Sequence, residues 1–425
     1  RLSKYKFFIL LFLYQTLINM IRKIILVCAV MLGISASISA ETFNYTYNTR
    51  NQTAFELNVP VPDGNWLVTM KIGSKTRAAR TFVKAETRRL FVNDLQTAKG
   101  EFKTVSFVVN KRDKIIRENG QDVAQVRIKP REVGKLNWDD FLNLEISGDA
   151  PAVESITIEP ATGVTTVFLC GDSTVVDQDI EPWASWGQMF PWFFDNSVAI
   201  ANYAESGERA DTFIGAGRLR KILSLMQPGD YVFVEFGHND MKLKGPGYGG
   251  YYFFATQLKK FVDEVRAKGG IPVLVSPTHR RNFDEQGKIV ESHEDYPAGM
   301  EWVARREGVE FINLHRMSGI FFEALGVEGS KKAFVHYKAG SYEGMPNDVA
   351  DNTHFNPYGA FELAKCMVSG IQSKGLPLAA HVVNFCGFSP AMPDAPETFH
   401  WPNSPYRNTM APQVLEKDDK ATESK

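Results

Sequence analysis

The stretch VFLCGDSTVVDQ (residues 167–178) decides how this chain is interpreted. Its apolar run breaks at Gly171, and Asp172, Ser173 and Thr174 follow directly. Taken alone, this composition is that of a strand that ends in a turn and a capped helix start. In an α/β sheet, the carboxyl end of the first strand is also where a nucleophilic serine would be displayed. The surrounding sequence distinguishes the two interpretations.

Short apolar runs alternate with helix-period segments from Thr165 onward. One such segment is FATQLKKFVDEVRAKG (residues 254–269), and a last helix is expected at residues 357 to 373. The apolar runs are TTVFLC, VAIANY, DYVFVEF, IPVLVS and VEFINL. This alternation predicts a three-layer α/β/α domain over residues 161 to 382, with a parallel sheet covered by helices on both faces.

Residues 41 to 160 have a different pattern, in which short runs alternate apolar and polar residues. The runs are FELNVPV, NWLVTMKIG, RRLFVNDL, TVSFVVN, QVRIKP, FLNLEISG and SITIEP. Many short strands separated by Gly, Pro, Asn and Asp predict an antiparallel β-sandwich domain in front of the α/β domain. Residues 383 to 425 are Pro-rich and then charged, which predicts an extended C-terminal tail that ends in disorder.

Length and composition exclude several classes of function. A chain of 425 residues is long enough for two domains with tails. Its net charge of -1 argues against a nucleic-acid partner or a membrane-surface binder. The sequence has no Walker loop, HExxH pair or paired CxxC motif, so it predicts neither a phosphate cradle nor a metal site. Three cysteines would remain after removal of the N-terminal segment described next, and this odd number does not suggest a disulfide scaffold.

The first 40 residues are interpreted as an upstream segment and a signal peptide. From Met20, MIRKIILVCAVMLGISASISA has the basic start, apolar run and small-residue end of a secretory signal. We therefore expect a secreted or periplasmic protein with no stable membrane insertion after cleavage. A retained membrane anchor is the alternative. Residues 1 to 19 lack an initiator Met and are interpreted as upstream translation.

Polar clusters follow the predicted strands of the α/β domain. They are GDS (171–173), NYAESG (202–207), FGHND (236–240), PTHRR (277–281) and, before the last helix, DNTH (351–354). Ligands of doubly wound sheets bind outside the carboxyl ends of the strands. The clusters therefore predict a functional site at this edge.

The residue types in these clusters suit acyl transfer. A serine hydroxyl is a weak nucleophile and needs a base within hydrogen-bonding reach, which a third group orients. We expect Ser173 to be the nucleophile, His354 its general base and Asp351 the orienting carboxylate. The oxyanion then needs preorganised donors, for which the Ser173 and Gly207 backbone N–H groups and the Asn239 side chain are expected. This chemistry requires no metal or organic cofactor.

The four blocks resemble those of the SGNH hydrolase superfamily, in the same order. They are Gly171-Asp-Ser-Thr174, Gly207, Gly237-His-Asn-Asp240 and Asp351-Asn-Thr-His354. Within it, EFGHND, SPTHRRNF and DNTHFNPYGA resemble the rhamnogalacturonan acetylesterase family. The resemblance covers about residues 164 to 374 and implies a flavodoxin-like α/β/α fold, the triad and oxyanion donors given above, and an acetylated polysaccharide substrate. Glu208-Arg209-Ala210 departs from the small hydroxyl residues usual in that block.

Residues around this site have open interpretations. His238 either orients the site or merely packs. His279, Arg280 and Arg281 either face an acidic sugar or are solvated charges. The stretch LKGPGYGGYYF (243–253) is either a wall on which a sugar stacks or a plain exposed loop. The remaining histidines are interpreted as surface or structural residues: His293, His315, His336, His381 and His400.

The sequence thus predicts a secreted carbohydrate esterase that removes acetyl groups from plant cell-wall polysaccharide, with rhamnogalacturonan (pectin) favoured. Alternatives are another SGNH esterase (a xylan acetylesterase, lipase, thioesterase or arylesterase) and a non-catalytic polysaccharide-binding protein. The N-terminal sandwich resembles galactose-binding-like domains. It either binds polysaccharide or packs against the catalytic domain.

Overall fold

The computed structural model describes residues 41 to 405, of which 42 to 405 belong to one compact unit. The expected signal segment (1–40) and residues 406 to 425 of the expected tail lie outside the described residues. Among the residues described, no helix is both long enough and apolar enough to cross a bilayer.

The described chain begins with strands and changes to alternating strands and helices after β10. The strands are β1 Phe43–Thr46, β2 Phe55–Pro60, β3 Gly64–Gly73, β4 Ala79–Ala85, β5 Arg89–Thr97, β6 Phe102–Lys111, β7 Ile115–Glu118, β8 Gln121–Gln125, β9 Phe141–Ala150, β10 Val153–Pro160, β11 Thr165–Cys170, β12 Val198–Asn202, β13 Tyr231–Glu235, β14 Ile271–Val275, β15 Glu310–Ile312, β16 Phe334–Tyr337 and β17 Val349–Phe355. The helices are α2 Trp186–Met189, α3 Ala210–Gly215, α4 Arg218–Leu225, α5 Phe253–Ala267, α6 Tyr296–Glu307, α7 Leu314–Gly329 and α8 Pro357–Ser373.

Five parallel strands form the part of the molecule that positions the site. They lie in the order β12-β11-β13-β14-β15, which is the 2-1-3-4-5 order of flavodoxin-like folds. Leu169 on β11 pairs with Asn202 on β12, and Cys170 pairs with Val234 on β13. This register brings the carboxyl ends of the neighbouring strands β12, β11 and β13 to one level, as the sequence predicted for a ligand site.

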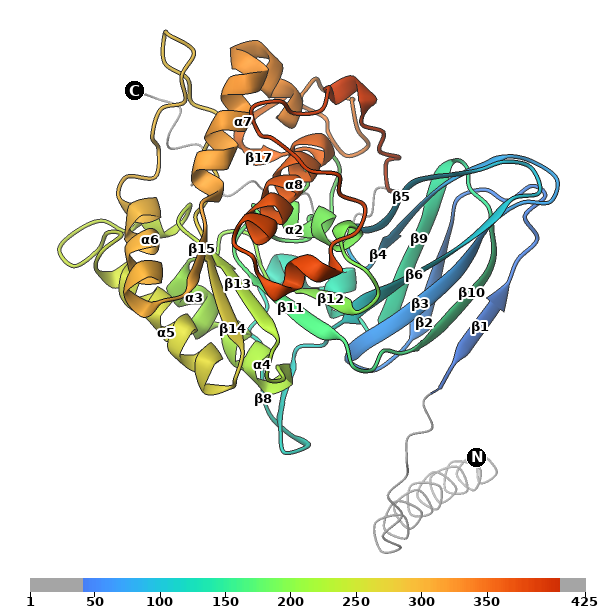
Figure 1. Cartoon of the computed structure of the whole chain (residues 1–425), viewed down its shortest axis with the longest axis horizontal. Coiled ribbons are helices and arrows are strands. Elements are labelled where there is room, and N and C mark those ends of the chain that lie inside the picture. Colours follow the sequence, from blue (N-terminus) through green and yellow to red (C-terminus); the bar gives the residue numbers. More distant parts are fainter. Residues whose placement is uncertain (1–40, 406–425) are drawn as a thin grey trace, which may run out of the picture. The chain divides into compact units, whose positions relative to one another are not determined.

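Helices cover both faces of the parallel strands, which confirms the predicted three-layer fold. Alternate residues of β11 point to opposite faces: Val167 and Leu169 pack into one core, and Phe168 and Cys170 into the other. The first core contains side chains of α2, α7 and α8, and the second contains those of α3 to α6. Figure 1 shows the two groups of helices on either side of the sheet.

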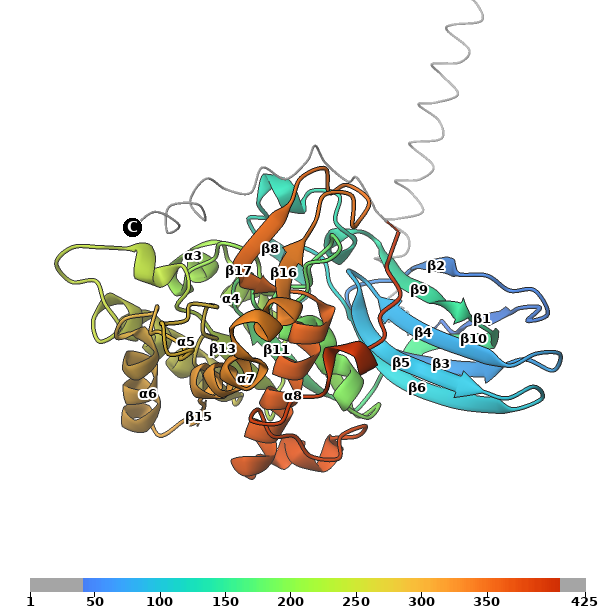
Figure 2. The same cartoon turned by 90° about the horizontal axis from the view of Figure 1, so that it is seen from above.

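The N-terminal strands form two antiparallel sheets that enclose a core of their own. The sheet β2-β9-β4-β5 faces the group β1-β10-β3-β6 through side chains such as Trp66, Met70, Leu144 and Ile156. This β region lies to one side of the α/β layers in both views (Figures 1 and 2).

The β region continues into the parallel sheet. Strand β6 pairs with β12 in parallel through Val108 and Val109, so β1-β10-β3-β6 and the five parallel strands form one nine-stranded sheet. The division at residue 160 stays a prediction, and the two predicted regions share this sheet.

Individual strands of the β region differ from the prediction. QVRIKP (125–130) was expected to be a strand, but it leaves β8 at Gln125 and runs into a short 3₁₀ helix at Pro130–Glu132. Within this stretch, the Arg127 backbone N–H donates to the Ala216 carbonyl oxygen at 2.8 Å, and the Lys129 side chain bonds to the Gly207 loop, as described below. Strand β4 was not among the predicted strands. Its sequence ARTFVKA places Phe82 between Arg80 and Lys84 on one face, so polar and apolar residues do not alternate regularly along it.

The described part of the tail, residues 383 to 405, packs back on the molecule. Tyr358 on α8 donates a hydrogen bond to the Asp394 carbonyl oxygen, and Lys365 forms an ion pair with Asp394 at 2.7 Å. Further on, the Pro402 carbonyl oxygen accepts a hydrogen bond from Lys84 at 2.6 Å. The tail therefore links α8 to β4.

Candidate active site

The structure brings Ser173, His354 and Asp351 into one chain of hydrogen bonds. His354 Nε2 lies 2.8 Å from Ser173 Oγ, and His354 Nδ1 lies 2.7 Å from Asp351 Oδ2. Ser173 and His354 are each 9% exposed, so the pair is shielded from water but reachable. This is the arrangement in which a base can take the serine proton while a carboxylate holds its other nitrogen.

Asp351 and His354 lie on β17, beside an irregularity in its pairing with β16. Val335 pairs with Asp351, whereas its neighbour Phe334 pairs with Phe355, so the residues between bulge out of the ladder. Asp351 Oδ1 accepts hydrogen bonds from the backbone N–H groups of Thr353 (2.8 Å) and His354 (2.9 Å). The bulge thus lets two residues that are three apart in the chain point to one site.

The surroundings of Asp351 keep it ionised. Burial on its own raises the pKa of this carboxyl, but the charge of His354 and the hydrogen bonds from His354 and Thr353 outweigh burial and bring the pKa to about 2. An ionised Asp351 requires a proton on His354 Nδ1, which leaves the Nε2 lone pair directed at Ser173.

The expected oxyanion donors follow the three neighbouring strands β11, β12 and β13. Gly207 has a φ of 71°, a conformation that favours glycine, and Gly237 has a φ of 142°. Asn239 Nδ2 donates to the carbonyl oxygen of Glu208 at 3.1 Å, which places the amide next to the Gly207 loop. Ser173, Gly207 and Asn239 therefore lie on adjoining loops at one edge of the sheet.

Cations from the β region hold the Gly207 loop, and sequence reasoning did not single them out. Lys129 Nζ donates to the Ser206 carbonyl oxygen at 2.7 Å and lies 3.2 Å from Glu208 Oε1. Arg131 bonds to the same carbonyl oxygen and to Glu205 Oε1 at 2.8 Å. Glu208, where the sequence departs from the family pattern, is thus a buried anchor of the loop. Nothing local in the sequence signals these contacts, because they join loops far apart in the chain.

A buried polar network lies next to Ser173. Glu235, at the end of β13, accepts hydrogen bonds from Thr174 Oγ1 at 3.0 Å and from the Trp186 indole N–H. Thr174 Oγ1 also lies 3.0 Å from Asp172 Oδ1. Burial raises the pKa of Glu235 to about 8, and the charge of Asp172 adds to the shift. Burial likewise raises the pKa of Asp172 to about 6 and that of Asp240 to about 7.

Protonated Glu235 makes stability depend on pH. The pKa of Glu235 is higher in the folded protein than its ordinary value of 4.5. Its contribution to the free energy of unfolding is therefore complete below pH 4.5 and is lost as the pH rises towards 8. Glu235→Gln keeps the shape of the protonated carboxyl. We expect the melting temperature of the parent to fall between pH 5 and 8 and that of Glu235→Gln to fall less, as measured by calorimetry. Identical slopes for the two proteins would contradict a raised pKa at Glu235.

Arg281 is bonded to protein groups and holds the segment that carries Asp351 and His354. Its guanidinium donates to Ser330 Oγ at 3.0 Å, to Asn352 Oδ1 at 3.0 Å and to the Val327 carbonyl oxygen, and its backbone N–H donates to the Asn352 carbonyl oxygen at 2.8 Å. The residue is 9% exposed. We therefore expect Arg281 to position Asp351 through Asn352 instead of contacting a sugar carboxylate.

This role gives a specific result for Arg281→Ala. We expect kcat to fall about tenfold, by the size usual for a supporting residue, with little change in KM. The loss should be the same on a neutral acetyl ester and on an acidic polymer. Asn352→Ala should have a similar effect, and the double variant should be no worse than either single one because both act through one contact. A loss confined to the acidic polymer would instead favour a carboxylate contact.

The other residues with open interpretations lie beside the site. His238 is 2% exposed, and its ring nitrogens lie 3.2 Å from Thr278 Oγ1 and 2.9 Å from His293 Nε2. Arg280 donates to the His238 carbonyl oxygen at 3.3 Å, and its charge lowers the pKa of Asp172 against the effect of burial. His279 stacks on His315. His293 and His315, interpreted from the sequence as surface or structural, are buried with them.

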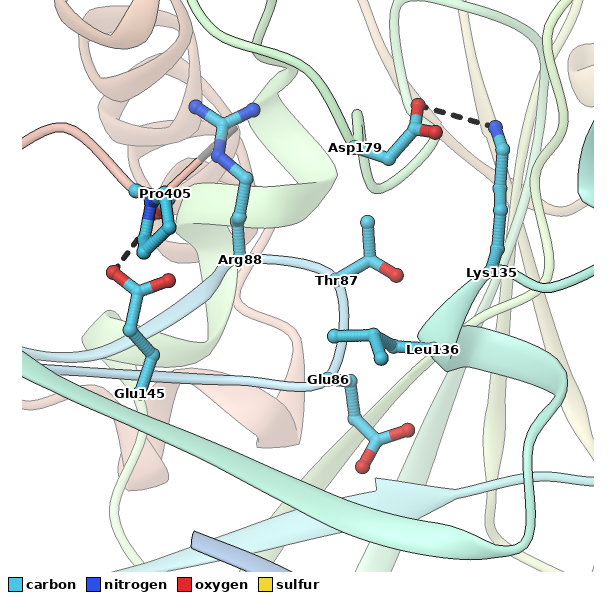
Figure 3. A pocket seen from close by; sticks show the side chains of 9 residues that line it. Glu86, Thr87, Arg88, Lys135, Leu136, Glu145, Asp179 and Pro405 are labelled. Carbon is cyan, nitrogen blue, oxygen red and sulfur yellow. Dashed lines mark hydrogen bonds and ion pairs between the residues drawn. The ribbon is translucent and has the colours of Figure 1, made fainter. Parts of the chain in front are cut away.

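A pocket near the loop that follows Ser173 is lined by charged residues of both regions. The turn between β4 and β5 contributes Glu86, Thr87 and Arg88 to its lining. Lys135 and Asp179, which also line it, form an ion pair at 3.2 Å (Figure 3). Arg88 donates to the Gln178 carbonyl oxygen at 3.0 Å, and Gln178 Nε2 in turn donates to the Ser173 carbonyl oxygen at 2.9 Å. The β region thereby supports the backbone at Ser173.

Comparisons with known proteins agree with this geometry. The sequence model of the GDSL-like Lipase/Acylhydrolase family matches residues 169–360. Rhamnogalacturonan acetylesterase RhgT of Bacillus subtilis is 40% identical over 220 residues, which are 51% of this chain and 94% of that protein. Probable rhamnogalacturonan acetylesterase YesY of Bacillus subtilis is 32% identical over 220 residues, 51% of this chain and 97% of that protein.

Among solved structures, YxiM of Bacillus subtilis is 23% identical with a TM-score of 0.45, covering 81% of this chain and 87% of that one. The two sequence relatives are matched over nearly their whole lengths and at identities of 40% and 32%. The chain belongs to the rhamnogalacturonan acetylesterase-like family of SGNH (GDSL-like) hydrolases, and the protein is an esterase.

Proposed function

We propose that the protein is an exported carbohydrate esterase that removes acetyl groups from rhamnogalacturonan through an acyl-enzyme on Ser173. The observation that carries the proposal is the hydrogen-bonded chain from Asp351 through His354 to Ser173, at distances of 2.7 and 2.8 Å. The family relationship supports ester hydrolysis, and the names of the two sequence relatives support the choice of polymer.

The proposed reaction begins with attack on the acetyl carbonyl. His354 Nε2 takes the proton of Ser173 as Oγ bonds to the carbonyl carbon, and Asp351 stabilises the imidazolium that results. The carbonyl oxygen becomes an oxyanion, to which the N–H groups of Ser173 and Gly207 and the Asn239 amide donate. A donor of this kind typically contributes about 3 to 4 kcal/mol of transition-state stabilisation.

The tetrahedral intermediate then collapses to the acyl-enzyme, and water completes the reaction. His354 gives its proton to the sugar oxygen as the carbon–oxygen bond breaks, which releases a free hydroxyl and leaves acetyl-Ser173. His354 then takes a proton from water, whose oxygen attacks the acetyl carbon. The proton passes to Ser173 Oγ as acetate departs. None of these steps requires a group other than the side chains named and water.

A polar substrate suits the surroundings of the site. Arg280 lies beside it, and the loop after Asp240 exposes Tyr248, Tyr251 and Tyr252 by 41%, 44% and 64%. Exposed aromatic rings of this kind stack on sugar rings, and cations pair with sugar carboxylates.

Acetate release from a panel of polymers tests the substrate. Acetylated rhamnogalacturonan, homogalacturonan and xylan are each incubated with the parent and with Ser173→Ala, and acetate is measured enzymatically. We expect the highest kcat/KM on rhamnogalacturonan and a rate of release by the variant at least about 10⁴-fold lower than that of the parent. Preference for xylan would contradict the proposed substrate but leave the esterase mechanism standing.

Export is a separate part of the proposal and rests on the signal-like sequence from Met20. N-terminal sequencing of the protein from its native host tests it. We expect the mature chain to begin directly after Ala40, in the periplasm or the medium. A chain that retains residues 20 to 40 in the cytoplasm would contradict export.

A further inference from the structure

Four histidines gather behind the active site, where three loops and a helix meet. His238 follows β13, His279 follows β14, His293 precedes α6, and His315 lies in the first turn of α7. The rings of His293 and His315 have centroids 5.4 Å apart, and those of His279 and His315 are 3.5 Å apart. Glu291 borders this cluster on the solvent side, with its side chain 48% exposed.

The two ring nitrogens of His315 both face hydrogen-bond acceptors. Nδ1 lies 2.9 Å from the Pro277 carbonyl oxygen, which can only accept, so Nδ1 carries a hydrogen. Nε2 lies 2.7 Å from Glu291 Oε2. In a neutral ring with its hydrogen on Nδ1, Nε2 has a lone pair, and the carboxylate oxygen opposite is also an acceptor. Two acceptors come this close when a cation lies between them. Nε2 of His315 and Oε2 of Glu291 are therefore two donor atoms that face one another at the solvent side of the cluster.

The donor set points to a metal ion. One donor atom each from His279, Glu291 and His315 lies within 4.8 Å of the other two. Nδ1 of His279 is buried and has no hydrogen-bond partner among the described residues. A buried, unpartnered imidazole nitrogen beside a carboxylate and a second imidazole is the environment of a metal ligand more than of a packed side chain.

The groups around these donors orient them as outer-shell partners do in metal sites. The Pro277 carbonyl oxygen fixes the tautomer of His315, which leaves the Nε2 lone pair facing Glu291. The second oxygen of Glu291 accepts from the His293 backbone N–H at 2.5 Å. Ser318 Oγ accepts from the His279 backbone N–H at 2.9 Å and donates to the His315 carbonyl oxygen at 2.9 Å, which ties two of the ligands together.

We propose that His279, Glu291 and His315 bind a divalent transition-metal ion, with Zn²⁺ the best fit. Two imidazoles and one carboxylate suit zinc, whereas calcium and magnesium prefer sites made of oxygen alone. Glu291 faces solvent, so an ion can enter and a water can complete a tetrahedral set. The site is distinct from the Ser173 site, and ester hydrolysis needs no chemistry from it.

Binding requires a small rearrangement with a direct structural consequence. At zinc–ligand lengths of about 2.0 to 2.2 Å, tetrahedral ligand atoms lie about 3.3 Å apart. The Glu291–His315 contact of 2.7 Å must therefore widen, and the exposed Glu291 side chain is free to adjust. A ring lone pair lies in the ring plane, so the stacked rings, inclined by 29°, must tilt apart for both to reach one ion.

The ion would brace the loop between β14 and α6. His279 lies next to Arg280 and Arg281, which contact the His238 carbonyl oxygen and the Asn352 segment respectively. Glu291 is at the far end of the same loop, and His315 belongs to α7. Fixing both ends of the loop to α7 would hold the wall of the active site in place.

Zinc binding to the full chain tests the proposal. The protein, prepared without a polyhistidine tag and stripped with a chelator, is titrated with Zn²⁺ in a calorimeter, and its thermal unfolding is followed with and without the ion. We expect one zinc per chain and a melting temperature that rises by a few degrees. Co²⁺ in place of zinc should give the visible absorption of a tetrahedral site, and Ca²⁺ should not compete.

Glu291→Gln, His279→Gln and His315→Gln each remove one ligand and should weaken zinc binding at least about tenfold. Glu291 is exposed, so its variant tests the site even if a buried histidine variant does not fold. His381→Gln is the matched control. His381 ends the short 3₁₀ helix that follows α8, and its variant should bind zinc like the parent. Unchanged affinity in Glu291→Gln would overturn the proposal. So would failure of the parent to bind zinc, because the cation beside His315 would then be a proton.

Discussion

Ser173→Ala is expected to lower kcat/KM for an acetyl ester by at least about 10⁴-fold. Without Oγ no acyl-enzyme can form, and His354 loses the group that it deprotonates at 2.8 Å. The oxyanion donors remain, so some residual hydrolysis by bound water is expected. The measurement is the steady-state rate on p-nitrophenyl acetate and on acetylated polymer.

The control for Ser173→Ala is Ser224→Ala, which removes a hydroxyl that donates to the Lys221 carbonyl oxygen on α4. It should retain the parent rate on both substrates. Circular dichroism should show that both variants are folded. Turnover by Ser173→Ala within a few-fold of the parent would assign the chemistry to another residue.

Asp351→Asn is expected to lower kcat by about 10³- to 10⁴-fold while the fold stays intact. In the parent, Oδ1 of Asp351 accepts from two backbone N–H groups and Oδ2 faces His354 Nδ1. An asparagine would keep its oxygen on the two backbone donors and turn its N–H₂ towards His354. The imidazole would then hold its hydrogen on Nε2, where it cannot accept the serine proton.

The matched control for Asp351→Asn is Asp348→Asn. Asp348 precedes β17 and forms an exposed ion pair with Lys338, so its loss should change kcat by less than about twofold. Equal and small effects of the two substitutions would contradict the tautomer argument. A large loss for Asp351→Asn with a parent-like melting temperature is the expected outcome.

The sequence predicted the parallel strands and the triad contact because both have local signals. Apolar runs such as TTVFLC and DYVFVEF can only be strands buried on both faces, and β11 and β13 match them closely. Ser173, Asn239 and His354 were singled out because each polar cluster follows such a run or precedes the last helix. The topology of an α/β sheet then brings the strand ends together without any further information.

What the sequence did not predict depends on contacts between distant segments. The pairing of β6 with β12 joins two regions whose hydrophobic patterns differ, and no local feature of the sequence at Val108 or Val109 indicates this pairing. The support of Gly207 by Lys129 and Arg131 was missed for the same reason. Arg281 was interpreted as a candidate for substrate binding because its charge is visible in the sequence, whereas its bonds to Ser330 and Asn352 are not.

The histidine cluster is a similar case. Metal motifs are recognised in sequences by ligands at short, fixed spacings on one element. His279, Glu291 and His315 come from the two ends of a long loop and from a helix beyond α6, so their spacing matches no such motif.

Covalent labelling of Ser173 tests the central claim most directly. The parent and His354→Ala are treated with diethyl p-nitrophenyl phosphate, which transfers its phosphoryl group to a serine activated by a neighbouring base, and their peptides are analysed by mass spectrometry. We expect one diethylphosphoryl group per chain, on Ser173, in step with loss of activity, and none on Ser173 of the variant. Inactivation of the parent with Ser173 unmodified, or with the label on another residue, would contradict it.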